Sequence, residues 1–113
     1  MKLYHGTSSE LLPSIKKKGL YTTRDEPYTV CFTDNIDTAV DYAYEIYTFE
    51  GTTGTPVVLE IEIPSRYIKR VSGPDEFQLK HSRILDPKFI KRVLWIKTNK
   101  DRVSFKITKK TKL

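Results

Sequence analysis

The stretch LYHGTSSELLPSIKKKGL, residues 3–20, places a His-Gly-Thr sequence between a short apolar segment and an amphipathic one. Residues 2–5 have the composition of a short strand. Thr7 and Glu10 have the spacing of a capping box, which predicts that a helix begins at this point. The stretch therefore predicts a strand, a tight turn and a helix, with the histidine next to the turn.

The end of the predicted helix is marked by charge and by glycine. Lysines occupy 16–18, where cations suit the helix dipole, and Gly19 is a natural C-terminal stop. Pro13 is tolerated only near the start of a helix. Leu12 and Ile15 are then expected to face the core.

The bulk composition is that of a globular domain. The chain has 113 residues, 38% hydrophobic and 30% charged, which fits a single domain over 1–113. No apolar run approaches the ~20 residues that span a bilayer, and the N-terminus lacks the apolar core of a secretory signal. One cysteine allows no internal disulfide and no thiolate zinc cluster. We expect a cytoplasmic protein, possible host cytoplasm included, with no membrane partner and no metal.

The net charge of +6 is distributed unevenly along the chain. Residues 1–64 hold 5 Lys/Arg and 10 Asp/Glu, whereas residues 65–113 hold 15 Lys/Arg and 4 Asp/Glu. A basic C-terminal half indicates attraction to phosphates or to an acidic partner. A solvated lysine-rich surface is the alternative interpretation.

The middle of the chain predicts a strand, a helix and a second strand. Residues 29–33 are β-branched and aromatic. Asp34 or Asn35 can cap the helix that follows. Its apolar side chains recur at helical spacing: Ile36, Ala39, Val40 and Ala43. A glycine- and threonine-rich loop at 49–55 leads to a strand over 57–63, which Pro64 closes.

The last third of the chain predicts strands with short connections. We expect strands at 77–80, 92–98 and 102–108, a capped turn at 86–91 and a polar turn at 99–101. Because helices come early and most strands come late, the pattern predicts an α+β domain with an antiparallel sheet.

Common catalytic signatures are absent from the sequence. It has no Walker loop, no G-x-G-x-x-G and no G-x-S-x-G. Two histidines and one cysteine make a metal site improbable. In isolation, His5 is more often a capped or core histidine than a ligand, and Glu76 more often a turn carboxylate. Tyr42 alone is equally well an interfacial tyrosine.

Three segments in order change this interpretation, because together they resemble the ADP-ribosyltransferase superfamily, in particular its poly(ADP-ribose) polymerase and diphtheria-toxin-like branch. The resemblance covers residues 3–93. The first segment, 3–20, matches at Tyr4, His5, Gly6, Thr7, Ile15, Gly19 and Leu20. The second, VCFTDNIDTAVDYA, matches at Phe32, Asp34 and Tyr42, and the third, GPDEFQLKHSRILDPKFI, at Glu76, Phe77 and Leu79.

The resemblance implies that NAD is the co-substrate and that its nicotinamide–ribose bond is broken. By that resemblance His5 contacts the adenosine ribose, the Gly6 backbone contacts the nicotinamide amide, and Tyr42 stacks on its ring. Glu76 holds the ribose 2′-hydroxyl and stabilises developing positive charge. The implied catalytic residues are Glu76 and His5; the implied NAD-binding residues are His5, Gly6, Thr7, Cys31, Phe32, Thr38 and Tyr42.

The sequence departs from the family pattern at two positions. The family's His-Tyr-Glu triad has its tyrosine where this chain has Cys31, and a nicotinamide-binding serine corresponds to Ala39, beside Thr38. Arginine-directed members carry Glu or Gln two residues before the catalytic glutamate, where this chain has Pro74. The resemblance therefore disfavours arginine as the acceptor.

These observations predict an ADP-ribosyltransferase-like split antiparallel β-sandwich with an NAD cleft between its sheets. The expected activity is mono-ADP-ribosyl transfer from NAD to a macromolecular acceptor, nucleic acid or acidic protein, with release of nicotinamide. An NAD-dependent RNA 2′-phosphotransferase and a catalytically degenerate binding domain are the alternatives. Small members of the superfamily resemble toxins, phage effectors or repair factors, and the sequence does not distinguish them.

Overall fold

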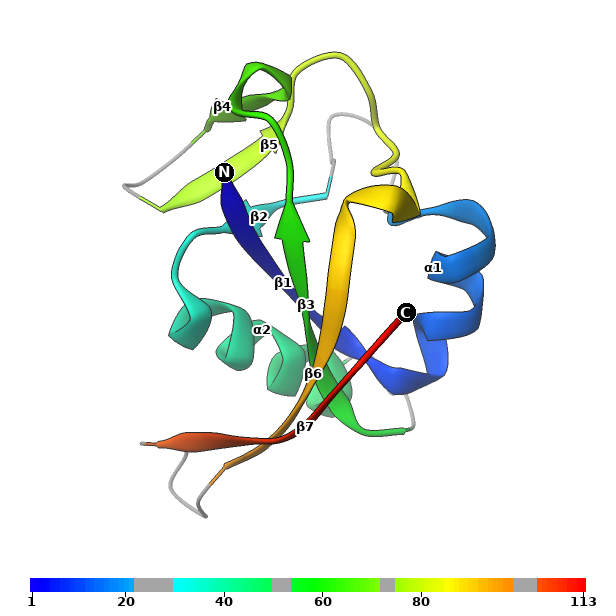
Figure 1. Ribbon diagram of the computed structural model, residues 1–113. Coiled ribbons are helices and arrows are strands. Elements are labelled where there is room, and N and C mark those ends of the chain that lie inside the picture. The colour runs from blue at the N-terminus through cyan, green and yellow to red at the C-terminus, as the bar shows by residue number, and fades with distance from the viewer. Residues whose placement is uncertain (22–29, 50–53, 72–74, 99–103) are drawn as a thin grey trace.

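The computed structural model describes residues 1–21, 30–49, 54–71, 75–98 and 104–113. Within these ranges one antiparallel sheet has the strand order β4-β5-β2-β1-β3-β6-β7 (Figure 1). The strands are β1 (Lys2–Ser8), β2 (Phe32–Thr33), β3 (Pro56–Glu62), β4 (Ile68–Arg70), β5 (Glu76–Leu79), β6 (Ile90–Thr98) and β7 (Phe105–Thr111). The predicted α+β class with an antiparallel sheet is confirmed.

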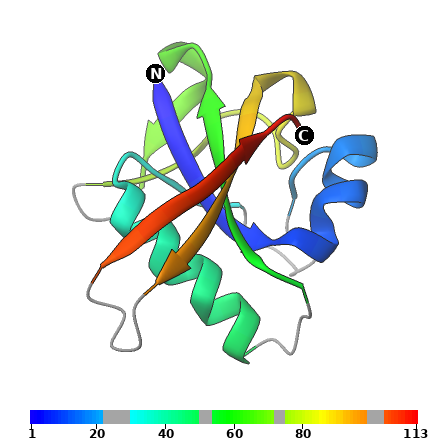
Figure 2. The same cartoon turned by 60° about the horizontal axis from the view of Figure 1, so that its bottom comes forward.

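Two α-helices lie on opposite faces of the sheet (Figures 1 and 2). They are α1 (Leu12–Lys18) and α2 (Ile36–Phe49), and three short 3-10 segments join other elements: η1 (Ser9–Leu11), η2 (Ser65–Tyr67) and η3 (Pro87–Phe89). None of the helices described here is long and apolar enough to cross a membrane.

The core has one apolar cluster on each face of the sheet. On the α1 face, Ile15 packs with strand residues that include Leu3, Phe32 and Leu59. On the α2 face, the helix contributes Ala39, Val40 and Ala43, and the strands contribute Val58, Leu94 and Ile96. Both faces of the central strands are thus covered, which explains why β3 is buried at every position except Glu62.

The predicted helix start at Thr7 is wrong. Thr7 lies inside β1, opposite Val57, and only 2% of its surface is exposed. The strand continues to Ser8, because continued pairing with β3 satisfies backbone groups that a capped turn would leave unpaired. The helical turn starts later, as η1 followed by α1.

The predicted end of this helix is confirmed. Pro13 lies in the first turn of α1, the three lysines lie in its last turn, and Gly19 follows with φ +87°. The Gly19 N–H donates to the carbonyl of Ile15 at 2.8 Å. Ile15 is buried and Leu12 packs against the core, as expected.

The start of α2 confirms one of the two predicted caps. The Asn35 Oδ1 accepts from the N–H of Asp37 at 2.9 Å. Ala39 and Ala43 then face β1, where α2 approaches the strand so closely that a Cβ on Gly6 would lie 2.0 Å from the Ala39 carbonyl oxygen. Gly6 therefore sets the distance between helix and sheet.

The other element boundaries agree with the sequence in part. β5 lies within one residue of its predicted strand. β2 covers only Phe32–Thr33 of the strand predicted over 29–33, since Val30 and Cys31 are not in a strand and residue 29 lies outside the described residues. β4, a three-residue edge strand, was missed. The capped turn is η3, where Asp86 Oδ1 accepts from the Lys88 N–H at 2.9 Å. Residues 102–103 of the last predicted strand, its turn at 99–101 and most of the predicted loop lie outside the described residues.

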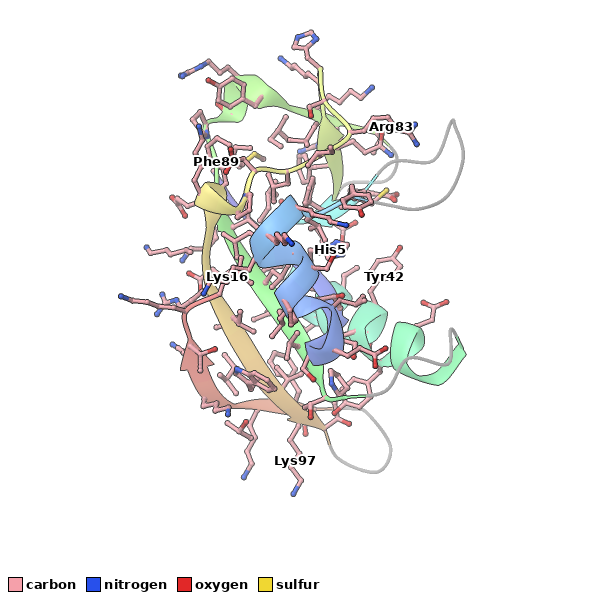
Figure 3. The ribbon with its side chains drawn as sticks, turned by 90° about the vertical axis from the view of Figure 1, so that its right-hand side faces the viewer. His5, Lys16, Tyr42, Arg83, Phe89 and Lys97 are labelled. Atoms are coloured by element: carbon pink, nitrogen blue, oxygen red, sulfur yellow. The ribbon has the colours of Figure 1, made fainter. Side chains whose placement is uncertain are left out.

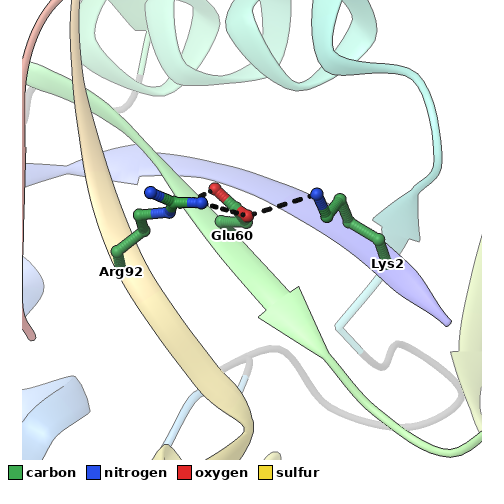
Figure 4. A network of polar contacts seen from close by, with 3 residues as sticks. All are labelled: Lys2, Glu60 and Arg92. Atoms are coloured by element: carbon green, nitrogen blue, oxygen red, sulfur yellow. Dashed lines mark hydrogen bonds and ion pairs between the residues drawn. The ribbon is translucent and has the colours of Figure 1, made fainter.

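Glu60 is the one buried carboxylate in the described part of the chain, with 4% of its surface exposed. Arg92 binds it through Nε at 2.8 Å and Nη2 at 3.2 Å, and the Lys2 Nζ lies 3.5 Å away (Figure 4). Burial by itself raises the pKa of Glu60, but the Arg92 hydrogen bonds and the two positive charges outweigh it, so the pKa lies below 4.5. The network joins β1, β3 and β6.

The sheet is nearly divided between β1 and β2. β1 pairs with β3 along its whole length, but its ladder with β2 is the single pair Tyr4↔Thr33. The β1–β2 ladder, with its one pair, is thus the shortest ladder of the described sheet. It joins the group β4-β5-β2 to the group β1-β3-β6-β7.

Candidate functional site

His5 lies on β1 next to this division of the sheet. Its Nδ1 is 2.9 Å from the carbonyl oxygen of Cys31. A carbonyl only accepts hydrogen bonds, so Nδ1 carries the hydrogen and Nε2 is left as an acceptor in the neutral ring. Burial lowers the pKa of His5 below 6.5, although the hydrogen bond to Cys31 opposes the shift. His5 is therefore neutral at pH 7, and its ring packs edge-on against Phe32 at 6.0 Å.

The backbone of Gly6 faces the gap in the β1–β2 ladder. Met1 exchanges hydrogen bonds of 2.8 and 3.0 Å with Ile63, and the β1–β3 register runs unbroken from Lys2 to Ser8. In an antiparallel ladder alternate residues bond to opposite neighbours. The N–H and C=O of odd-numbered β1 residues therefore point to β3, and those of Tyr4 and Gly6 point to the β2 side.

The β1–β2 ladder stops before it reaches Gly6. A continued register would pair Gly6 with Cys31, but within the described residues the ladder contains only the pair before it. The Cys31 carbonyl, which would have faced the Gly6 N–H, is bound by the His5 ring. His5 thus occupies a main-chain acceptor and ends the ladder beside Gly6.

Glu76 comes to this place from β5. It pairs with Thr33, which pairs in turn with Tyr4, so the three residues form one row across β5, β2 and β1. Two strand spacings put the backbones of Tyr4 and Glu76 about 10 Å apart. The sheet thus brings the third predicted segment next to the first.

Cys31 and Gln78 form a polar contact beside Glu76. The Gln78 amide donates to the Cys31 Sγ at 3.3 Å. Burial raises the pKa of Cys31, the Gln78 hydrogen bond lowers it, and the neighbouring Glu76 carboxylate raises it further. The side chain is therefore a thiol at pH 7. Sequence reasoning missed Gln78, although its position two residues after Glu76 puts both on one face of β5.

Tyr42 completes the cluster from α2. It is 48% exposed, and Figure 3 shows it standing out from the helix. Partial burial and then the charge of Glu76 raise the pKa of Tyr42, with smaller effects of Cys31, Glu45 and Asp75. The phenol is neutral at pH 7.

A hydrogen bond links α2 to the residue that directly precedes β5. The Thr38 Oγ1 donates to the Asp75 Oδ2 at 3.3 Å. The contact holds the start of α2, which carries Tyr42, to the strand that carries Glu76.

The structure brings most of the expected site residues together, but not all of them face the gap. His5, Gly6, Cys31, Tyr42 and Glu76 gather at the division of the sheet, with Thr38 at its border. By contrast, Phe32 is 2% exposed and packs in the core, and Thr7 is buried one residue beyond Gly6 on β1. Their contribution is to position the β-strands and the His5 ring.

Ala39 occupies the position where the family's serine is expected. It is fully buried, and its carbonyl oxygen faces Gly6. Its methyl group therefore supplies no polar contact to a ligand.

No protein-family model and no curated protein matches this sequence. Among the described residues, no group of three or more His, Cys, Asp or Glu side chains could hold a metal ion. The arrangement of these side chains and the three sequence segments are therefore the features that bear on function. Pro74, which bears on the acceptor, lies outside the described residues.

Proposed function

We propose that this protein is an NAD-dependent mono-ADP-ribosyltransferase whose site lies at the division between β1 and β2. One observation carries the proposal: where the β1–β2 ladder of the described residues stops, the Gly6 N–H and C=O face the β2 side and Glu76 lies in one row with Thr33 and Tyr4. The charge of Glu76 also acts on Tyr42. The interrupted sheet is the feature that favours a split sandwich of the ADP-ribosyltransferase type.

The Gly6 peptide edge suits a primary carboxamide. The N–H and C=O of one residue in an extended strand point the same way, so they offer a donor and an acceptor side by side. The nicotinamide carboxamide has the complementary acceptor and donor. The carboxamide can therefore pair with the Gly6 peptide at the position where the β1–β2 ladder stops, while Tyr42 covers one side of the nicotinamide ring.

The Glu76 carboxylate supplies the electrostatic part of catalysis. The bond between the ribose C1′ and the nicotinamide nitrogen breaks, its electron pair leaves with nicotinamide, and C1′ becomes cationic. A fixed negative charge near that carbon stabilises the transition state. The acceptor atom then forms the new bond to C1′ and gives up its proton.

The neutral His5 ring suits a hydroxyl-bearing ligand. With Nδ1–H held by Cys31, Nε2 accepts from a ribose hydroxyl, and the fixed tautomer makes this contact predictable. The Cys31 thiol is small and protonated, so we assign it no nucleophilic role. Its size leaves space where the related family has a tyrosine.

The acceptor is a macromolecule under this proposal. Glu76 is followed along the chain by the basic residues Lys80 and Arg83 and preceded by Arg66, Lys69 and Arg70. Such a surrounding attracts polyanions over several ångströms at physiological salt. Among the described residues, no contact favours an RNA 2′-phosphotransferase over simple transfer.

The test is incubation of the protein with adenylate-labelled NAD and cell lysate, followed by nuclease or protease. We expect wild type to attach label to material that one of the two enzymes degrades, and Glu76→Gln to attach none. Asp75→Asn removes a neighbouring carboxylate and is the matched control, which should keep measurable transfer. If wild type neither attaches nor hydrolyses NAD, the proposal is wrong, and the site is then a binding site without turnover.

A further inference from the structure

The two C-terminal strands, with the residues that flank them at 87–89, 104 and 112–113, form a ribbon whose charged side chains are all basic. Residues 87–98 and 104–113 contain eight Lys or Arg and no Asp or Glu. Arg92 is paired with Glu60. In the described part of the chain, no ion pair joins any of the seven lysines of this ribbon to a carboxylate.

Three of these lysines lie on one face of the ribbon. Lys97 on β6 is directly opposite Lys106 on β7, and Trp95 is opposite Lys109. Trp95 and Lys97 are two residues apart on a strand, so these four side chains share a face. The Lys109 Nζ lies 4.4 Å from the centre of the Trp95 ring. Figure 3 shows Lys97 extending from the end of β6.

The pair Lys97↔Lys106 is unfavourable in the protein alone. Side chains directly opposite in an antiparallel ladder have Cβ atoms about 5 Å apart, and like charges there are destabilising. Lysines on an edge strand do discourage pairing with other sheets, which would explain Lys106. Lys97, however, is on the inner strand β6, so edge protection does not explain it.

We propose that this face of the β6–β7 ribbon, Lys97, Lys106 and Lys109, binds the phosphate backbone of nucleic acid. A phosphate between Lys97 and Lys106 neutralises both charges. Lys109 follows Lys106 by three residues, and the register shift between them brings both to the face of Lys97. Three residues span at most about 10 Å of strand, which lets the two lysines contact different phosphates of one backbone. This face recognises phosphate charge and not base sequence. Lys109 covers the Trp95 ring and the Trp95 Nε1 donates to Thr111, so Trp95 offers neither its ring face nor its N–H to a base.

An acidic protein is a poorer partner for this surface. Protein interfaces have an apolar core in which charged residues are depleted. Among the described residues of β6 and β7, Ile107 is the one large apolar side chain counted as exposed, at 36%, and it lies on the opposite face of the ribbon, level with Ile96. A uniformly charged strip suits a uniformly charged polymer.

The inference goes beyond the proposed function and does not depend on it, because binding requires no NAD. The experiment measures fluorescence anisotropy of labelled duplex DNA and of labelled single-stranded RNA without NAD, as salt is raised. The variants are Lys97→Gln/Lys106→Gln and the control Lys16→Gln/Lys17→Gln. The control removes the same charge from the last turn of α1.

We expect the ribbon variant to reduce the slope of log K against log salt by about 1.8 for duplex DNA or about 1.4 for single-stranded RNA. For duplex DNA, the ratio of wild-type affinity to ribbon-variant affinity should then fall about tenfold between about 50 and about 200 mM salt. The preferred nucleic acid, duplex DNA or single-stranded RNA, is the one whose binding by wild type falls more steeply as salt is raised.

Equal losses for the ribbon and control variants would overturn the assignment to this ribbon. So would competition by polyglutamate as effective, per charge, as that of unlabelled nucleic acid, because the surface would then accept any acidic polymer, protein included. Retained thermal stability of both double variants confirms that the comparison concerns binding and not folding.

Discussion

Replacing Gly6 by alanine tests the close approach of α2 to β1, on which the site depends. The added Cβ would lie 2.0 Å from the Ala39 carbonyl oxygen and 2.5 Å from the Ala43 N–H nitrogen. Real Cβ contacts essentially never fall below 3.0 Å, so the helix must retreat by about 1 Å, and both obstacles are backbone atoms that cannot rotate away. Overpacking usually costs about 1–3 kcal/mol, occasionally more. Because α2 has to move as a unit, we expect a loss of about 3 kcal/mol.

For a domain of this size such a loss lowers Tm by about 12 °C. Urea and thermal unfolding, followed by circular dichroism, measure it. Asp41→Ala on the exposed side of α2 is the control and should stay within about 0.5 kcal/mol of wild type. A Gly6→Ala protein that loses less than about 1 kcal/mol would refute the packing described here, since no rigid contact of this kind could then exist.

Three further results are expected. Glu60→Gln should lower the free energy of unfolding, measured in urea, by about 2 kcal/mol, because it removes charged hydrogen bonds from Arg92. Wild type should lose stability as pH falls below 4.5, and the variant should lack this loss. Burial holds the pKa of His5 below 6.5, so the unfolded chain binds the proton at a higher pH than the folded protein does. Stability should therefore fall as pH drops from 6.5 through the folded-state pKa. His5→Gln should remove this part of the dependence of stability on pH, and an unchanged dependence would contradict the burial of His5. Lys97→Gln/Lys106→Gln should raise Tm at low salt and reduce the stabilisation that added salt gives wild type, whereas a lower Tm would show that the pair is not repulsive.

The sequence predicted the elements whose signals are local. Gly19 ends α1 because a positive φ suits glycine, and Asn35 caps α2 through its own side chain. Neither depends on distant parts of the chain. The helical spacing of apolar residues in α2 likewise contains its own evidence of which face is apolar, because Ala39, Val40 and Ala43 form the buried face.

Long-range pairing explains what local reasoning missed. The capping-box spacing at Thr7 and Glu10 is real, but pairing with β3, about fifty residues later in the chain, keeps Thr7 in the strand. β4 has three residues and no apolar alternation, so only its partner β5 defines it.

The candidate site was predictable as a set of residues, but not as a geometry. The three segments named His5, Gly6, Tyr42 and Glu76 through resemblance. The single-pair contact of β1 with β2, and the His5 ring that caps the Cys31 carbonyl, follow from tertiary structure. Gln78 could have been included from its period-two relation to Glu76.

The measurement that tests the proposed chemistry most directly is nicotinamide release from NAD by purified wild type, Glu76→Gln and Asp75→Asn, with water or added nucleic acid as the acceptor of the ADP-ribosyl group and with unfolding curves to confirm equal folding. The proposed role of Glu76 predicts release by wild type and a loss of about 10²- to 10³-fold in Glu76→Gln, with a much smaller loss in Asp75→Asn. Equal rates for wild type and a folded Glu76→Gln would contradict that role.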